Sequence, residues 1–271
     1  MSIRRYSLAI ALAFGASAFA GPEWMEMGES GSVPGNAQAT TGNGALAKIS
    51  GTLSGPGAGP KLGAPGATGD FQDMYLIKIV DPLNFRATTL PGLNGGAEFD
   101  AQLFLFTPDG LGLVANLDAT AGTTDPLLLP DANDGTGAII DAPGLYLLAI
   151  SGFPSFPRSI NGPIFEFDLF QETSGPDGNG GSQPIIGWNG PGQFGQYEIA
   201  LTGAELIPVN ELGCDPADIA EPFGEHNFSD IILFLSEYSA GVLDLTDLAA
   251  PFGVLNFSDV IAFLTEFADG C

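Results

Sequence analysis

The stretch "AQLFLFTPDGLGLVANL", residues 101–117, indicates the fold class of this chain. Two short apolar runs, 101–106 and 111–117, flank the sequence Thr107-Pro108-Asp109-Gly110. Proline presets φ at the first central position of a turn and glycine accepts a positive φ, so these four residues predict a tight turn. We therefore expect residues 101–117 to form a β-hairpin.

Other runs of the same kind predict further strands. In the run 74–80, Tyr75, Ile77 and Ile79 alternate onto one face. The remaining predicted strands are 44–53, 85–90, 144–152, 164–170 and 195–203. No stretch with a helical period interrupts these runs, so the pattern predicts a mostly β domain, an antiparallel β-sandwich or jelly roll.

Four segments of this domain, "DMYLIKI", "FDAQLFLFTPDG", "APGLYLLAISG" and "GQYEIALTG", resemble the bacterial pre-peptidase C-terminal β-sandwich in pattern and order. The resemblance covers about residues 70–204, and residues 153–192 depart from it as a long insertion rich in glycine and proline. Because such domains are usually non-catalytic attachments to secreted proteins, the resemblance implies an accessory or binding role.

The end of the chain contains an internal repeat. Residues 218–241 and 247–270, offset by 29, are identical at 14 of 24 positions, and each copy contains "PFG" and "NFSD". Apolar residues recur at helical spacing after each "NFSD", so each copy predicts one amphipathic helix. Two short helices must bury their apolar faces against each other, and we expect one small two-fold unit. The predicted core of this unit comprises Phe223, Phe228, Ile232, Leu235, Phe252, Phe257, Ile261 and Leu264.

Tandem copies of a loop followed by a helix, ending in Gly270-Cys271, resemble a bacterial dockerin module of the type that ends in Gly-Cys. The resemblance covers residues 214–271 and implies a protein receptor for the module. It also implies calcium loops in which Asp230 and Asp259 take the twelfth position and Asn227 and Asn256 take the ninth.

The first half of each loop departs from the dockerin pattern. Positions one, three and five become Ile219, Glu221 and Phe223 in the first copy, and Leu248, Ala250 and Phe252 in the second. Calcium takes six to eight oxygen ligands, and most of these side chains supply none. Calcium is therefore possible but not required. We favour helix capping by Asn227, Asn256, Asp230 and Asp259 over calcium binding, with Asp218 and Asp247 as the best argument for the metal.

The chain contains two cysteines, Cys214 and Cys271, which bracket the repeat. In an oxidising compartment they are expected to form a disulfide, and a free thiol at Cys271 that serves covalent attachment is the alternative.

The single histidine, His226, excludes multi-histidine metal sites. In the "DANDGTG" stretch, residues 131–137, Asp131, Asn133 and Asp134 are expected to serve turn chemistry, with a loop calcium as the alternative.

The amino terminus predicts export. Arg4 and Arg5 precede a short apolar run, and Ala18-Phe19-Ala20 precedes Gly21, as in a secretory signal peptide cleaved after Ala20. The run is too short to span a membrane. The chain carries a net charge of −25, and no lysine or arginine follows Arg158. Such a surface disfavours nucleic acid and anionic lipid.

These observations predict five segments and one function. The segments are a signal peptide (1–20), an extended arm rich in Gly, Ala, Ser and Thr (21–44), a β-sandwich (45–206), a linker (207–213) and a dockerin-like repeat (214–271). We expect a secreted, extracellular or cell-surface protein without catalytic activity, whose β-sandwich binds a polymer or surface partner and whose repeat anchors it. The alternatives are a carbohydrate-active enzyme that uses a carboxylate pair, and a C-terminal sorting tag in place of an anchor.

Overall fold

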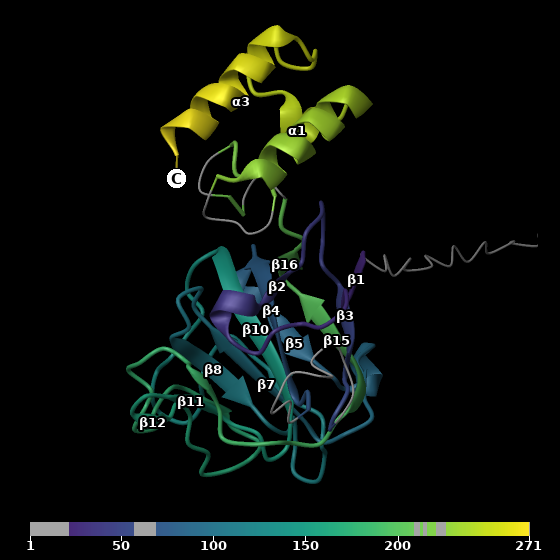
Figure 1. Cartoon of the computed structure of the whole chain (residues 1–271). Helices are drawn as coiled ribbons and strands as arrows, with labels where there is room; N and C mark the ends of the chain where they lie inside the picture. Colours follow the sequence, from purple (N-terminus) through teal and green to yellow (C-terminus); the bar gives the residue numbers. More distant parts are fainter. Residues whose placement is uncertain (1–21, 57–68, 209–211, 214–215, 221–225, 271) are drawn as a thin grey trace, which may run out of the picture.

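The computed structural model describes residues 22–56, 69–208, 212–213, 216–220 and 226–270. The predicted signal peptide (1–20), the cysteines Cys214 and Cys271, and Phe223 of the predicted repeat core lie outside the described residues. The described chain is mostly β, with a small helical part at its carboxyl end (Figure 1). Within the described ranges, no helix has the length and apolar character needed to cross a bilayer.

Two main sheets form the β-rich body, residues 22–208. The first sheet has the order β1 (Glu23–Met25), β3 (Lys48–Leu53), β15 (Gly195–Thr202), β5 (Arg86–Thr88) and β9 (Leu127–Leu128), with β6 (Gly96–Ala97) beside β15. The second has the order β13 (Thr173–Ser174), β8 (Gly112–Asn116), β7 (Ala101–Phe106), β10 (Gly144–Gly152), β4 (Gln72–Ile79) and β16 (Ala204–Glu205), with β2 (Gln38–Ala39) beside β4. A small third sheet joins β12 (Gly162–Pro163), β11 (Pro157–Ser159) and β14 (Gly187–Trp188). Single 3-10 turns occupy Pro34–Asn36, Pro82–Asn84 and Pro91–Leu93.

The hairpin predicted from residues 101–117 is present as β7 and β8. These strands pair antiparallel with Leu105 opposite Val114, and Gly110 has φ 87° in the connecting turn. The N–H of Gly110 donates to the carbonyl of Thr107 across 2.9 Å, which closes the turn. The hairpin predicted from the sequence is therefore confirmed. A prediction of this kind succeeds because the turn that joins the two strands is a local feature of the sequence.

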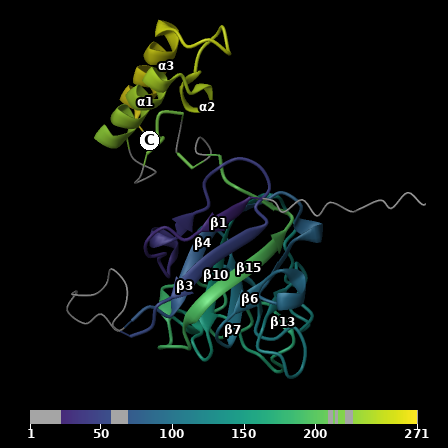
Figure 2. The ribbon, with the colours of Figure 1, turned by 90° about the vertical axis from the view of Figure 1, so that its right-hand side faces the viewer.

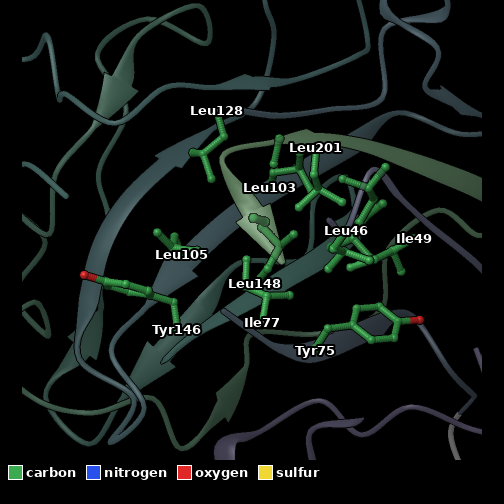
Figure 3. Packing of buried hydrophobic residues seen from close by; sticks show 14 of the residues in the cluster. Leu46, Ile49, Tyr75, Ile77, Leu103, Leu105, Leu128, Tyr146, Leu148 and Leu201 are labelled. Carbon is green, nitrogen blue, oxygen red and sulfur yellow. The ribbon is translucent and has the colours of Figure 1, made fainter. Parts of the chain in front are cut away.

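One hydrophobic core cluster takes its side chains from both main sheets (Figure 3). Ile49 and Leu201 come from the first sheet, whereas Ile77, Leu103 and Leu148 come from the second. Figure 3 shows these residues converging on one another. Burial of a single large aliphatic side chain contributes roughly 1.5–3 kcal/mol, so this shared cluster is the main reason that the two sheets stay together.

The second sheet is buried on both of its faces. In β7, Leu103 and Leu105 belong to the shared cluster, and Phe104 and Phe106 belong to a second cluster on the opposite face. The second cluster is completed by Ile164, Phe165 and Ile185 from the long insertion. Burial on both faces explains why residues 101–106 are a continuous apolar run without alternation.

The run 164–170, predicted as a strand, is not one. It passes through bends and a turn, and its backbone bonds to neighbouring loops: the N–H of Ile164 donates to the carbonyl of Pro157, and the N–H of Glu166 to the Oδ1 atom of Asp177. Ile164, Phe165 and Phe167 pack in the cluster on the outer face of the second sheet, whereas Leu169 and Phe170 are exposed. Apolar content therefore indicated burial for the first part of the run only, and it did not indicate a strand.

The amino-terminal segment predicted as a separate arm is part of the body. Its strands β1 and β2 pair in parallel with β3 and β4, so the sheets are antiparallel except at these two pairs. Trp24 is 9% exposed, and Ser30 and Thr40 are fully buried. At the other end, the N–H of Ile207 donates to the carbonyl of Thr40, so the body continues into the segment predicted as a linker.

The carboxyl end forms the C-terminal module, residues 212–270 of the described chain. It contains α1 (Phe228–Ala240), the short α2 (Leu243–Thr246) and α3 (Phe257–Asp269). The predicted helices after each "NFSD" correspond to α1 and α3. These helices lie apart from the sheets in both views (Figures 1 and 2).

Candidate functional site

Both long helices of the C-terminal module begin with the same hydrogen-bonded cap. The side chain of Asn227 accepts from the N–H of Ser229, and the Oδ2 atom of Asp230 accepts from the N–H of Asn227 at 2.8 Å. Asn256 and Asp259 repeat this arrangement at α3. Side-chain oxygens at this end satisfy N–H groups that have no partner within the helix. The capping predicted from the sequence is therefore present in both copies.

The remaining oxygen of each aspartate holds the start of its own loop. The Oδ1 atom of Asp230 accepts from the N–H groups of Ile219 and Ala220, at 2.9 and 2.7 Å. The Oδ1 atom of Asp259 accepts from the N–H of Ala249 at 2.8 Å. These contacts join the first residues of the loop to the first turn of the helix.

The described side chains of the two loops supply few of the oxygens that a dockerin calcium loop needs. Ile219, Leu248 and Phe252 offer no side-chain oxygen, and both oxygens of each capping aspartate already accept backbone N–H groups. Asp247, which together with Asp218 was the best argument for the metal, accepts from the N–H of Gly253 through its Oδ2 atom, whereas its buried Oδ1 atom accepts no hydrogen bond. A calcium ion would have to displace these donors, and it requires six to eight oxygens. Each loop is joined to its helix by hydrogen bonds from backbone N–H groups of the loop to the capping aspartate.

We expect the helices of the C-terminal module to lose stability as the pH falls below about 3.9, the ordinary pKa of an aspartate. Backbone N–H donors, above all that of Asn256, lower the pKa of Asp259. A carboxyl with a lowered pKa in the folded state stabilises it above the unfolded-state pKa, and the contribution is lost as the pH falls through the folded value. The measurement is the denaturant midpoint of the circular dichroism signal at 222 nm, at pH 7 and at successive lower pH values.

The matched variant for this prediction is Asp259→Asn, because other carboxyl groups of this acidic chain also titrate. The variant should have a lower midpoint than the wild type at pH 7, and the two midpoints should converge in acid. A constant difference between them at all pH values would contradict the role of the Asp259 carboxylate.

The core of the C-terminal module differs from the core predicted by the helical spacing. Phe234 and Phe263, which are equivalent in the two copies, are each 1% exposed and stack with their ring centroids 4.0 Å apart. Ala217 and Ile219 complete the buried cluster. His226 stacks on Phe267 at 5.0 Å and is half-buried. The two copies therefore meet through their central phenylalanines.

The residues predicted as core instead form an exposed apolar stripe on each helix. On α1 the stripe is Phe228, Ile232 and Leu235, which are 71%, 55% and 54% exposed. On α3 the equivalent residues Phe257, Ile261 and Leu264, at 73%, 52% and 51%, repeat it, and Phe252 is also exposed. The prediction was wrong because each helix is apolar on two sides, and only one side can face the other helix.

The two stripes are identical in sequence although their surroundings are not. Phe-Ile-Leu recurs at the three stripe positions, whereas the neighbouring positions Leu233 and Ala262 differ between the copies. Large apolar side chains gathered on a surface mark sites of interaction with other molecules. The chain contains no lysine or arginine after Arg158, so α1 and α3 carry acidic but no basic side chains.

The loop "DANDGTG" serves turn chemistry and joins two segments of the body. The Oδ1 atom of Asp134 accepts from the N–H and hydroxyl of Thr136, and its Oδ2 atom accepts from the N–H of Gly175 at 2.6 Å. Asn133 accepts from the N–H of Thr173. Partial burial raises the pKa of Asp134, but these hydrogen bonds lower it by more, so the pKa is lower than that of an ordinary aspartate. Of the three residues predicted as alternative calcium ligands, Asn133 and Asp134 therefore use their side-chain oxygens to bind backbone N–H groups of the chain itself.

The long insertion also forms an open, aromatic pocket of about 590 Å³. Its lining includes Phe156, Phe165, Phe167 and Phe170, together with Arg158 and Glu166. An aromatic pocket with a few charged side chains at its edge has the character of a ligand-binding surface. The pocket was not predicted from the sequence, because the insertion departs from the β-sandwich pattern that the rest of the body resembles.

Sequence reasoning also missed a group of acids, Glu29, Asp70 and Asp73, which the fold brings together. The sequence does contain a sign of this group. Asp73 alternates in step with Tyr75, Ile77 and Ile79, so it lies on the same inward face of the strand as these buried side chains. These acids are not a hydrolase site, since Asp70 and Asp73 are 2% and 0% exposed and a sugar ring cannot reach them.

The expected disulfide between Cys214 and Cys271 lies outside the described residues and stays a prediction. Comparisons of the chain with models of protein families, with curated proteins and with solved structures found no match.

Proposed function

We propose that this chain is an exported protein without catalytic activity, in which a dockerin-like C-terminal module anchors a β-sandwich or jelly roll to a protein receptor. The observation that carries the proposal is the duplicated Phe-Ile-Leu stripe, exposed on α1 and again on α3. Apolar side chains at i, i+4 and i+7 of a helix are the usual anchors by which a helix binds an apolar groove.

The charge of the C-terminal module indicates the charge expected on the surface of its receptor. The C-terminal module has acidic but no basic side chains, so a receptor with an apolar groove and a basic rim is complementary to it. Complementary charge increases the association rate and rejects wrong partners. Anionic polymers such as nucleic acids are repelled by the same surface.

For the β-rich body we propose contact with a polymer or a surface partner through the aromatic pocket of the insertion. Phe156, Phe167 and Phe170 supply aromatic side chains to its lining, and Arg158 and Glu166 supply charged groups. The body then carries the binding activity, and the C-terminal module carries the attachment.

We expect the double variant Ile232→Asp/Ile261→Asp to lose affinity for the receptor by more than 100-fold, which corresponds to about 2.7 kcal/mol. Placing a charge at the centre of each stripe removes apolar contact and leaves an unpaired carboxylate in the interface. The receptor is first captured from the envelope fraction of the source cells with the full exported chain. Its dissociation constant is then measured with the purified receptor.

The control is Ser229→Asp/Ser258→Asp, which adds the same two charges at exposed, equivalent positions in the first turn of each helix. This variant should bind within a few-fold of the wild type. Equal losses in both variants would mean that net charge, not the stripes, governs binding.

The same preparation tests the two alternatives. Hydrolysis of a polysaccharide by the purified chain would replace our proposal by the carbohydrate-active enzyme. An exported product whose intact mass lacks the C-terminal module would replace the anchor by a sorting tag.

A further inference from the structure

Three acids from two segments of the chain lie close together in the β-rich body. Glu29 follows β1, Asp70 precedes β4, and Asp73 lies within β4. One carboxylate oxygen from each lies within 4.8 Å of the others. Tyr75 follows on the same face of β4, and its hydroxyl points away from the packed aliphatic side chains (Figure 3).

The two aspartates each keep a buried oxygen without a hydrogen-bond partner. Asp70 uses its Oδ2 atom to accept from the N–H of Ser54 at 3.0 Å, and Asp73 uses its Oδ2 atom to accept from the hydroxyl of Tyr197 at 2.6 Å. The Oδ1 atoms of Asp70 and Asp73 are buried and accept no hydrogen bond. A buried polar atom without a partner is costly, and a buried charge is costlier still. Two such atoms in one cluster indicate a missing ligand.

The charges around Asp73 are all of one sign. Burial in the first place, and then the charges of Asp70 and Glu26, raise the pKa of Asp73. Glu29 adds to the same effect. Lys48 in β3 forms ion pairs with Glu23 and Glu198. A cation bound among these carboxyl groups would offset their mutual repulsion and contact the two buried oxygens that lack a partner.

The surrounding residues hold the cluster in place. The carboxylate of Glu26 accepts from the N–H groups of Ser30 and Thr52, at 3.0 and 2.9 Å, which keeps the segment before Glu29 against β3. The hydroxyls of Tyr75 and Tyr197 lie 2.5 Å apart behind Asp73. A Cβ atom at Gly51 would lie 2.3 Å from the Tyr197 hydroxyl and 2.9 Å from Glu26, so only glycine leaves room for both.

We propose that Glu29, Asp70 and Asp73 bind one Ca²⁺ ion that fastens the amino-terminal segment to β4. The ligand set is all oxygen, which suits a hard cation and not zinc or copper. Ligands at 2.3–2.6 Å on opposite sides of one calcium ion are about 4.6–5.2 Å apart, so the observed spacing needs little rearrangement. Water completes the coordination, because three carboxylates supply at most six oxygens.

The proposal predicts one calcium site in the full exported chain. After removal of divalent ions with a chelator, isothermal titration with CaCl₂ should show one site, and the thermal midpoint of the β-rich body should rise with calcium. Bound Tb³⁺ should luminesce on excitation of the nearby tyrosines and should be displaced by Ca²⁺. Absence of binding to the wild type would overturn the proposal and leave a shared proton among the carboxylates in its place.

Two site variants and two controls locate the ion. Glu29→Gln and Asp70→Asn should each weaken calcium binding at least tenfold. Each variant should still unfold cooperatively in calcium-free buffer. Glu23→Gln removes an exposed acid from the same amino-terminal segment and should change the affinity less than threefold. Asp259→Asn tests the C-terminal loops and should leave the affinity unchanged. Equal losses in Glu23→Gln and Glu29→Gln, or a loss in Asp259→Asn alone, would overturn the assignment.

Discussion

Replacing Phe263 with alanine is expected to destabilise the C-terminal module by about 3–5 kcal/mol, the usual cost of removing a buried aromatic ring. Phe263 is 1% exposed and stacks face to face on Phe234, its equivalent in the other copy. A domain of this size has a total stability at or below about 5 kcal/mol, so the variant should lose its helices at room temperature. Circular dichroism at 222 nm in a denaturant series measures the effect in the full chain.

The control for this prediction is Phe257→Ala in the same helix. Phe257 belongs to the exposed stripe and is 73% exposed, so its truncation should change the free energy of unfolding by less than about 0.5 kcal/mol. A loss as large as that of Phe263→Ala would instead place the stripe in the core, as the helical spacing alone predicted.

Replacing Phe104 with alanine should destabilise the β-rich body by about 3–5 kcal/mol. Phe104 is fully buried on the outer face of the second sheet, where its ring lies 5.8 Å from Phe165 and 5.5 Å from Trp188. Its loss leaves a cavity between the sheet and the insertion. Tryptophan fluorescence in a denaturant series reports on it directly, because Trp188 packs against this cluster.

Phe170→Ala provides the comparison within the insertion. Phe170 is 47% exposed at the aromatic pocket, and we expect its truncation to cost less than about 1 kcal/mol. If Phe104→Ala cost no more than Phe170→Ala, the insertion would be a loose cover and the second cluster would contribute little to stability.

The helix caps show how far local sequence information reaches. Asn227 and Asp230 are three residues apart, and the cap depends on these residues and the first helical turn, so spacing alone was sufficient. The turn at Gly110 is equally local. Both features were predicted correctly because their partners are neighbours in the chain.

The segment 164–170 and the helix stripes show where such information ends. An apolar run indicates that its side chains will be buried or will bind another molecule. It does not indicate which part of the protein, or which partner, they will contact. Residues Ile164 and Phe165 cover the outer face of a sheet, and Phe228 and Ile232 face solvent, although both pairs are comparably apolar in sequence.

The mostly β body, the hairpin at residues 101–117, the repeated helices and the capping residues could be predicted from the sequence, since each rests on contacts within a few residues or on periodicity. The face of α1 that meets α3, the way the insertion covers the second sheet, and the proximity of Glu29, Asp70 and Asp73 became visible in the folded chain alone. These features depend on residues that are distant in the chain, and such contacts are set by the packing of whole elements, in which several apolar or acidic faces compete for the same partner.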